Sequence, residues 1–167
     1  MKARLATSEP VTSPPVAEAS GSVNTVIVAD DGRLIGDSTD GPAIAAAIAS
    51  EVGERYTGVV TVLGAGGVAP ALREAAGRLG CALHLRRHAE LAGARVGGAC
   101  AWTWPEEVDP PAGLRLDGAR VAIIAYGAPG RALATRVEQL GGTAVACGEG
   151  WFEAQATAQR RLWTVDD

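Results

Sequence analysis

The sequence predicts an α/β fold of the Rossmann type, in which helices cover both faces of a doubly wound parallel sheet. Predicted strands alternate with predicted helices through most of the 167 residues, and this alternation is typical of a parallel sheet. Residues 59–72, VVTVLGAGGVAPAL, lead from an apolar strand through a glycine-rich turn into a helix. Residues 120–126, RVAIIAY, are almost continuously apolar, which indicates a strand buried on both faces.

The individual elements follow from local patterns. Strands are predicted where apolar and β-branched side chains dominate, at residues 23–29, 33–36, 59–63, 82–86, 99–103, 120–126 and 143–147. The first two flank the turn signal at residues 30–32, DDG, and therefore form a hairpin. Helices are predicted where Ala, Leu and other helix formers dominate, at residues 40–50, 69–80, 89–95, 132–140 and 151–163. Residues 1–20 are rich in Pro and Ser and predict a loop.

Composition limits the class of protein. Hydrophobic residues make up 47% of the chain and charged residues 20%, which is typical of a globular protein. The formal net charge of −4 argues against nucleic acid as the main partner. No apolar run approaches the ~20 residues of a membrane-spanning helix, and the first residues lack the apolar core of a signal peptide. We therefore expect a protein without a membrane segment.

Neither the cysteines nor the histidines predict a metal site. Cys81, Cys100 and Cys147 are widely spaced and odd in number, and no C-x-x-C occurs, so we expect free, buried thiols in a reducing cytoplasm. His84 and His88 are four positions apart, but they fall at the end of a predicted strand and no third ligand is near. The sequence therefore predicts that no metal is bound.

The glycine-rich turn predicts a dinucleotide site. Gly64, Gly66 and Ala69 satisfy G-x-G-x-x-[GA] between a strand and a helix, where the backbone can approach a pyrophosphate at the helix N-terminus. The alternative is a tight turn with a purely structural role. The residues that we expect to bind the cofactor in this turn are Gly64, Ala65, Gly66, Gly67, Val68 and Ala69.

The end of the next strand predicts which dinucleotide is bound. A site selective for NAD places Asp or Glu there, to accept a hydrogen bond from the ribose 2′-hydroxyl. This chain has Arg86, Arg87 and His88 instead, and a guanidinium pairs with a 2′-phosphate, which an acid repels. We therefore expect NADP to be the cofactor, held in part by Arg86 and Arg87. The alternative is that both arginines only face solvent.

Several segments resemble the shikimate dehydrogenase family. Residues 22–26, SVNTV, are similar to its A-V-N-T-V strand, and residues 36–41, GDSTDG, to its G-x-N-T-D-G, with Ser38 in place of Asn. The glycine turn is similar to the family's G-A-G-G-x-A, and Arg87 falls on the arginine of its N-R-T-like NADP motif. Residues 148–155, GEGWFEAQ, resemble its closing G-x-x-M-L-x-x-Q. The family comprises two-domain NADP oxidoreductases that reduce 3-dehydroshikimate to shikimate in aromatic amino-acid biosynthesis, the chorismate pathway.

The resemblance implies roles for five further residues. Lys2 and Asp40 would form the catalytic pair, Asn24 and Gln155 would bind substrate hydroxyls, and Tyr126 would lie near the nicotinamide. Hydride addition to a carbonyl carbon requires a proton at its oxygen, and an ammonium beside a carboxylate can supply it. A structural alternative for Asp40 is the N-cap of the helix that follows, and both roles are compatible.

The position of Lys2 predicts how the chain is organised. It is the single lysine, and it lies 22 positions before Asn24, close to the family spacing. We therefore expect residues 1–22 to be a remnant of the family's substrate domain and residues 23–167 to form the NADP-binding domain. In this hypothesis the chain is a fragment or has a mis-called start. The alternative is that a lysine next to the initiator is a coincidence.

Three functions remain open at this point. The first is an NADP-dependent shikimate dehydrogenase-like oxidoreductase, acting on the small molecules shikimate and 3-dehydroshikimate as a monomer or homodimer. The second is a non-catalytic NADP-binding or regulatory module, or a decayed fragment. The third is a quinate dehydrogenase-like enzyme, because the cofactor residues do not determine which substrate is used.

Overall fold

The computed structural model describes residues 21–52, 58–64 and 66–164. Its centre is a parallel five-stranded sheet with the strand order β4-β3-β5-β6-β7. The strands are β3 (Val59–Leu63), β4 (Ala82–Arg86), β5 (Ala99–Trp102), β6 (Arg120–Ile123) and β7 (Thr143–Ala146). The predicted Rossmann-type α/β fold class is thereby confirmed, since a parallel sheet with crossover connections and flanking helices defines it.

Helices and loops cover both faces of this sheet. One core cluster joins the sheet to α2 (Asp40–Val52) and α3 (Ala69–Leu79) and includes fully buried Val62. The second cluster lies on the other face and includes Leu133 and Val137 of α4 (Gly127–Gln139) together with Leu91 of the short helix η1 (His88–Leu91). The apolar residues of the strands therefore point to two separate cores, as the continuous apolar pattern of residues 120–126 predicts.

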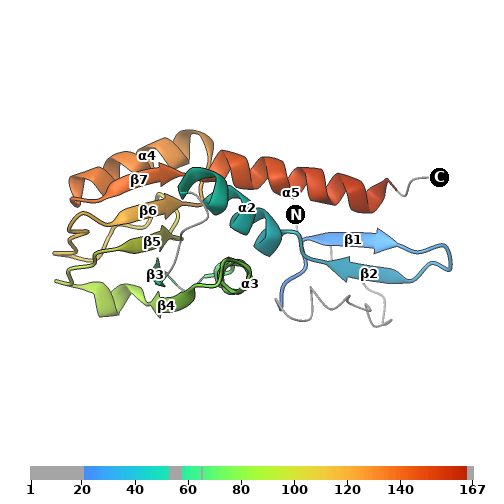
Figure 1. The fold of residues 1–167 in the computed structure, drawn as a ribbon, viewed down its shortest axis with the longest axis horizontal. Helices are drawn as coiled ribbons and strands as arrows, with labels where there is room; N and C mark the ends of the chain where they lie inside the picture. Colours follow the sequence, from blue (N-terminus) through green and yellow to red (C-terminus); the bar gives the residue numbers. More distant parts are fainter. Residues whose placement is uncertain (1–20, 53–57, 65, 165–167) are drawn as a thin grey trace.

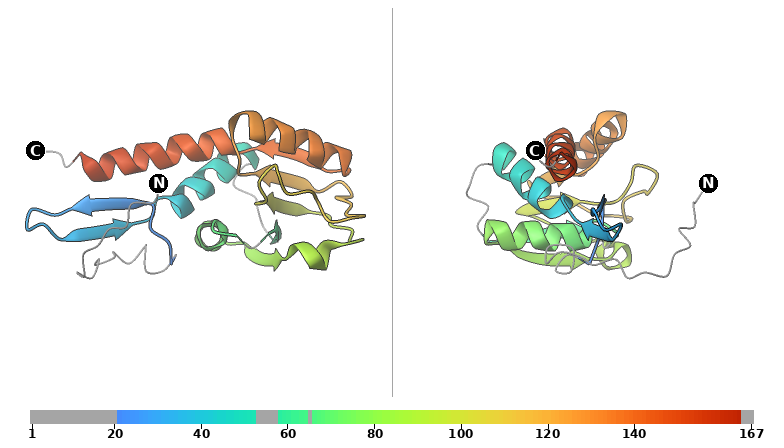
Figure 2. Two further views of the ribbon diagram at one scale, coloured as in Figure 1. Left: turned by 180° about the vertical axis from the view of Figure 1, so that it is seen from behind. Right: turned by 90° about the vertical axis from the view of Figure 1, so that its right-hand side faces the viewer.

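A hairpin lies outside the main sheet. Strands β1 (Thr25–Val28) and β2 (Leu34–Asp37) pair antiparallel, from Thr25 opposite Asp37 to Val28 opposite Leu34. Figure 1 shows the arrowheads of β5, β6 and β7 directed toward the side on which this hairpin lies. Two helices connect the hairpin with the sheet: α2 follows β2, and α5 (Gly148–Trp163) runs from the sheet out over β1 (Figures 1 and 2). The predicted domain boundary at Val23 remains a prediction.

The segment between β4 and β6 differs from the sequence-based expectation. A helix at residues 89–95 was expected, but only the four-residue 3₁₀ helix η1 forms. Gly93 adopts a φ of +69° and donates its N–H to Ala112 O at 2.8 Å, while Arg115 donates to Ala94 O at 2.9 Å. A nonlocal backbone pairing therefore ends the helix, because it uses the Gly93 N–H that a longer helix would have bonded internally.

Helix α4 also begins earlier than expected, at Gly127 rather than at residue 132. Pro129 is its third residue, where the missing N–H costs nothing because the first turn of a helix has no internal acceptor for it. The strand predicted at residues 120–126 correspondingly ends at Ile123. Within the described residues, no helix has both the length and the apolar character needed to cross a membrane.

Candidate cofactor and substrate site

The glycine loop lies where the strand order of the sheet reverses. From β3, the chain passes to β4 on one side, and then to β5 on the other side of β3. In open parallel sheets, ligands bind outside the carboxyl ends of the strands at such a switch point. The loop that begins at Gly64 follows β3 directly, so the fold places it at the position that a dinucleotide requires.

Gly64 is fixed by contacts on both sides. Its N–H donates to Arg86 O of β4 at 3.0 Å, and its φ of +127° is rarely adopted by residues with a side chain. An added Cβ would collide with Thr103 Oγ1 and lie 3.1 Å from Trp104 Nε1. Thr103 is itself held in place, because its hydroxyl donates to Leu63 O at 3.0 Å. Glycine at position 64 is therefore required by the packing of three strand ends.

Gly66 and Gly67 differ from Gly64, because no atom lies within 4 Å of a Cβ built at either position. Both are exposed. Val68 precedes α3 as its N-cap residue, and Ala69 is the first residue of the helix and is buried. The loop therefore leaves its outer side open for a ligand, next to the helix N-terminus. Ala65, the remaining loop residue of the prediction, lies outside the described residues.

Arg86 and Arg87 lie beside this loop, and an acid that the sequence analysis did not single out lies with them. The Arg86 guanidinium donates to Glu90 O at 2.7 Å, and its Nε is 3.7 Å from Glu90 Oε2. The same carboxylate accepts the Arg87 backbone N–H at 2.9 Å. Arg86 is half-buried, whereas Arg87 is exposed. Arg86 ends a strand and is not part of a helix, so the spacing of four between Arg86 and Glu90 did not by itself reveal this pair.

An aromatic group covers the neighbouring strand ends. Trp104 makes edge-to-face contacts with His88 (ring centroids 5.2 Å apart) and with Trp102 (5.1 Å). His88 Nε2 lies 2.8 Å from Asp109 O. His88 is thus engaged with a ring and a carbonyl, and His84 is exposed in β4. Among the residues that the structure describes, no three His, Cys, Asp or Glu side chains form a group that could hold a metal ion.

Asn24 is the centre of a hydrogen-bond network between the hairpin and α2. Its Nδ2 donates to Asp40 Oδ1 at 2.7 Å and to Thr39 Oγ1 at 3.1 Å. Its Oδ1 accepts the Thr39 backbone N–H at 3.0 Å and the Thr25 hydroxyl at 2.9 Å. The structure thus brings together Asn24 and Asp40, two of the residues that the resemblance implicates, and fixes the orientation of both.

Replacement of Asn24 by alanine is expected to lower the free energy of unfolding by about 2–3 kcal/mol, because it leaves several part-buried polar groups without a partner. Urea unfolding measures the change. Gln139→Ala is the matched control, because this amide is exposed at the end of α4 and its loss should cost less than about 0.5 kcal/mol. Equal effects of the two substitutions would show that the network does not stabilise the junction.

Asp40 is the first residue of α2, and burial raises the pKa of its carboxyl while the hydrogen bond from Asn24 opposes the shift. Among the described residues, no hydrogen bond from the backbone of α2 to this carboxylate is seen. The observed hydrogen bond of Asp40 is therefore with Asn24. The alternative role of Asp40 as the N-cap of α2 has no hydrogen bond to support it among the described residues. A partly buried carboxylate with one amide donor can still accept further hydrogen bonds.

The raised pKa of Asp40 predicts how the stability of an Asp40→Asn variant depends on pH. The carboxyl contributes stability that is fully present below its unfolded pKa of about 3.9 and is lost as the pH rises through the higher folded pKa. The isosteric amide does not titrate. The unfolding free energy of Asp40→Asn relative to the wild type should therefore increase between acid and neutral pH, in urea titrations at several pH values. A difference that falls with pH would contradict this.

The other two predicted substrate residues are Gln155 in α5 and Tyr126, the N-cap residue of α4. Gln155 is half-buried, and Gln159, one turn further along α5, donates to Asn24 O at 3.4 Å. Tyr126 is 48% exposed, and its ring packs against that of Phe152 with centroids 5.0 Å apart. The face of α5 that carries Gln155 therefore leads from the Tyr126 ring toward Asn24. Gln159 and Phe152 were not predicted to contribute to the site.

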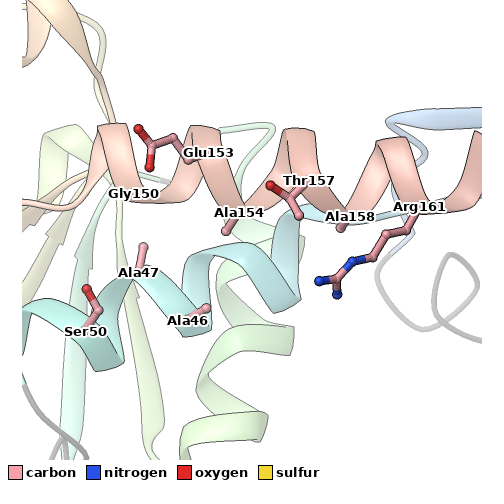
Figure 3. A pocket seen from close by; sticks show the side chains of 9 residues that line it. All are labelled: Ala46, Ala47, Ser50, Gly150, Glu153, Ala154, Thr157, Ala158 and Arg161. Carbon is pink, nitrogen blue, oxygen red and sulfur yellow. The ribbon is translucent and has the colours of Figure 1, made fainter.

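A hollow of about 520 Å³ lies elsewhere, between α2 and α5 (Figure 3). Small side chains such as Ala46, Ala154 and Ala158 line it, and Glu153 and Arg161 lie along the α5 side. None of the predicted site residues that the structure describes lines this hollow, so we do not assign the cofactor or the substrate to it. Lys2, the predicted partner of Asp40, lies outside the described residues.

The strand order, the two covered faces and the glycine loop at the switch point define an α/β protein of the Rossmann class. The chain is a homologue of shikimate dehydrogenases. It is 36% identical over 129 residues to the protein named shikimate dehydrogenase (NADP(+)) of Methylobacterium radiotolerans. This alignment covers 70% of the chain and 44% of that relative, so the match extends over less than half of the relative's length. No protein-family model matches the chain.

Solved structures agree on the fold. The shikimate dehydrogenase of Aquifex aeolicus superposes with a TM-score of 0.70 at 19% identity, covering 92% of this chain and 65% of that one. The shikimate 5-dehydrogenase of Listeria monocytogenes, a structure in complex with shikimate and NAD, gives a TM-score of 0.59 at 22% identity, with coverages of 92% and 67%. At these sequence identities, the structural similarity establishes the fold alone.

Proposed function

We propose that this chain binds NADP at the Gly64 loop and contributes to a shikimate dehydrogenase-like oxidoreductase. The observation that carries the proposal is the Asn24–Asp40 hydrogen bond of 2.7 Å, in a fold whose cofactor loop lies at the switch point of the sheet. The 36% identity to a relative whose name includes NADP(+) supports both parts. The Cys81 and Cys100 thiols are free, which agrees with a reducing cytoplasm as its location.

NADP would supply the chemistry of hydride transfer, and the Gly64 loop with Arg86 and Arg87 would hold its phosphates. Asn24 would orient the Asp40 carboxylate through its amide, and Asp40 would accept a hydrogen bond from a substrate hydroxyl. Lys2 would hold the proton for the carbonyl oxygen at its Nζ. Gln155 would reach a second hydroxyl from α5. In this arrangement the hairpin and the start of α2 would bind the substrate, and the sheet would carry the cofactor.

The experiment that tests the proposal measures NADPH formation by the chain with shikimate or quinate as the donor. Shikimate-dependent reduction of NADP that is lost in Asp40→Asn would support the proposal. Asn24→Ala provides a second variant, in which the same carboxylate is present without its amide donor. Reduction with quinate in place of shikimate would assign the third function considered above.

Binding of NADP without turnover on either donor would instead support a non-catalytic module. Binding of neither NADP nor NAD would contradict both candidates, because each places the dinucleotide on the Gly64 loop.

A further inference from the structure

We propose that Glu90 sets the balance between NADP and NAD by occupying the position that the 2′-phosphate of NADP must take. This inference rests on the proposed function, since it concerns the same cofactor site. The carboxylate Oε2 accepts the Arg87 N–H at 2.9 Å and lies 3.7 Å from Arg86 Nε. An oxygen of a bound 2′-phosphate would need the same donors, so the side chain acts as an internal anion at this site.

The position of Glu90 relative to the cofactor loop supports this role. Arg86 ends β4, and its carbonyl accepts the N–H of Gly64 at 3.0 Å, so the arginines and the loop meet at one strand end. In dinucleotide sites of this class, the ribose is read at the end of the second strand, about twenty residues after the glycines. Gly64 and Arg86 are 22 positions apart. Glu90 therefore lies beside the ribose position even though it is outside β4.

The Glu90 carboxylate would affect the binding of NADP and of NAD in opposite ways. A 2′-phosphate would be repelled by it and would have to displace it from Arg86 and Arg87, whereas the 2′-hydroxyl of NAD could donate a hydrogen bond to it. The Glu90 side chain is 52% exposed, so displacement needs only a rotation in solvent. The site thus contains cations that favour NADP and an anion that favours NAD, and its selectivity should be moderate.

Glu90→Gln tests the inference directly. The amide oxygen can still accept the Arg87 N–H, and the contact of Arg86 with Glu90 O, 2.7 Å long, uses the backbone, so the fold should be retained. Calorimetric titrations at one fixed salt concentration are expected to show NADP binding about fivefold tighter, as the loss of one exposed repulsive charge implies, and NAD binding unchanged or weaker. The gain should shrink as salt is raised.

Glu138→Gln is the matched control, because this exposed residue of α4 carries the same charge away from β4. If Glu90→Gln and Glu138→Gln show the same ratio of NADP to NAD dissociation constants, the inference is overturned, whereas the proposed function stands. If the wild-type chain binds neither cofactor, the proposed function itself fails, and this inference fails with it.

Discussion

Gly64→Ala is expected to lower the free energy of unfolding by about 3–5 kcal/mol, the sum of an unfavourable backbone conformation and an overpacked contact. The backbone at Gly64 has a φ of +127°, and the new methyl group would collide with the Thr103 hydroxyl. Thr103 cannot move away freely, because its side chain and its N–H both bind Leu63 O. Urea unfolding followed by tryptophan fluorescence measures the loss.

Two further variants separate the causes of this loss. Gly66→Ala introduces the same methyl group at a position where nothing lies within 4 Å, so its stability should stay within about 0.5 kcal/mol of the wild type. Thr103→Ala removes the colliding hydroxyl, and in a double-mutant cycle it should recover part of the Gly64→Ala loss but not the conformational part. A wild-type stability for Gly64→Ala would contradict the described packing of the loop.

Arg87→Ala is expected to weaken NADP binding by about thirtyfold, which corresponds to the loss of about 2 kcal/mol from a charge-assisted hydrogen bond. NAD has no 2′-phosphate, so its affinity should change by less than about twofold. The side chain of Arg87 is exposed, and its removal should leave the fold intact. Titration calorimetry with both cofactors provides the measurement.

The control for this substitution is Arg120→Ala. Arg120 is also exposed, but it begins β6 at the amino end of the sheet, away from the switch point. Its removal changes the net charge by the same amount and should weaken NADP and NAD equally. A parallel loss of affinity for both cofactors in Arg87→Ala would show that this arginine acts only through the general electrostatic field.

The strand, turn and helix that carry the proposed cofactor loop could be predicted from the sequence because their determinants are local. The strand Val59–Leu63, the turn at Gly64 and the helix that begins at Ala69 lie within a few residues of one another, and their pattern defines the unit. The bounds of β4 were equally predictable, since residues 82–86 are flanked by clear breaks. The contact between Asn24 and Asp40 was different, because it joins a hairpin to a helix and only the resemblance pointed to it.

Contacts that no sequence pattern revealed explain the errors. The helix expected at residues 89–95 is interrupted because Gly93 and Ala94 pair with the backbone of residues 112–115, which no local pattern reveals. Glu90 was overlooked because the ribose-reading position was assigned from the strand end alone. Its contact with Arg86 depends on the 3₁₀ turn that brings residue 90 back beside the strand. The spacing between Arg86 and Glu90 could be seen in the sequence, but the 3₁₀ turn could not be predicted from it.

Calorimetric titration of the wild-type chain with NADP and with NAD tests the central claim most directly. The account predicts one binding site, which holds NADP more tightly than NAD because of Arg86 and Arg87, and in which Arg87→Ala reduces the difference. Absence of NADP binding by a folded chain, or a preference for NADP that survives Arg87→Ala unchanged, would contradict it.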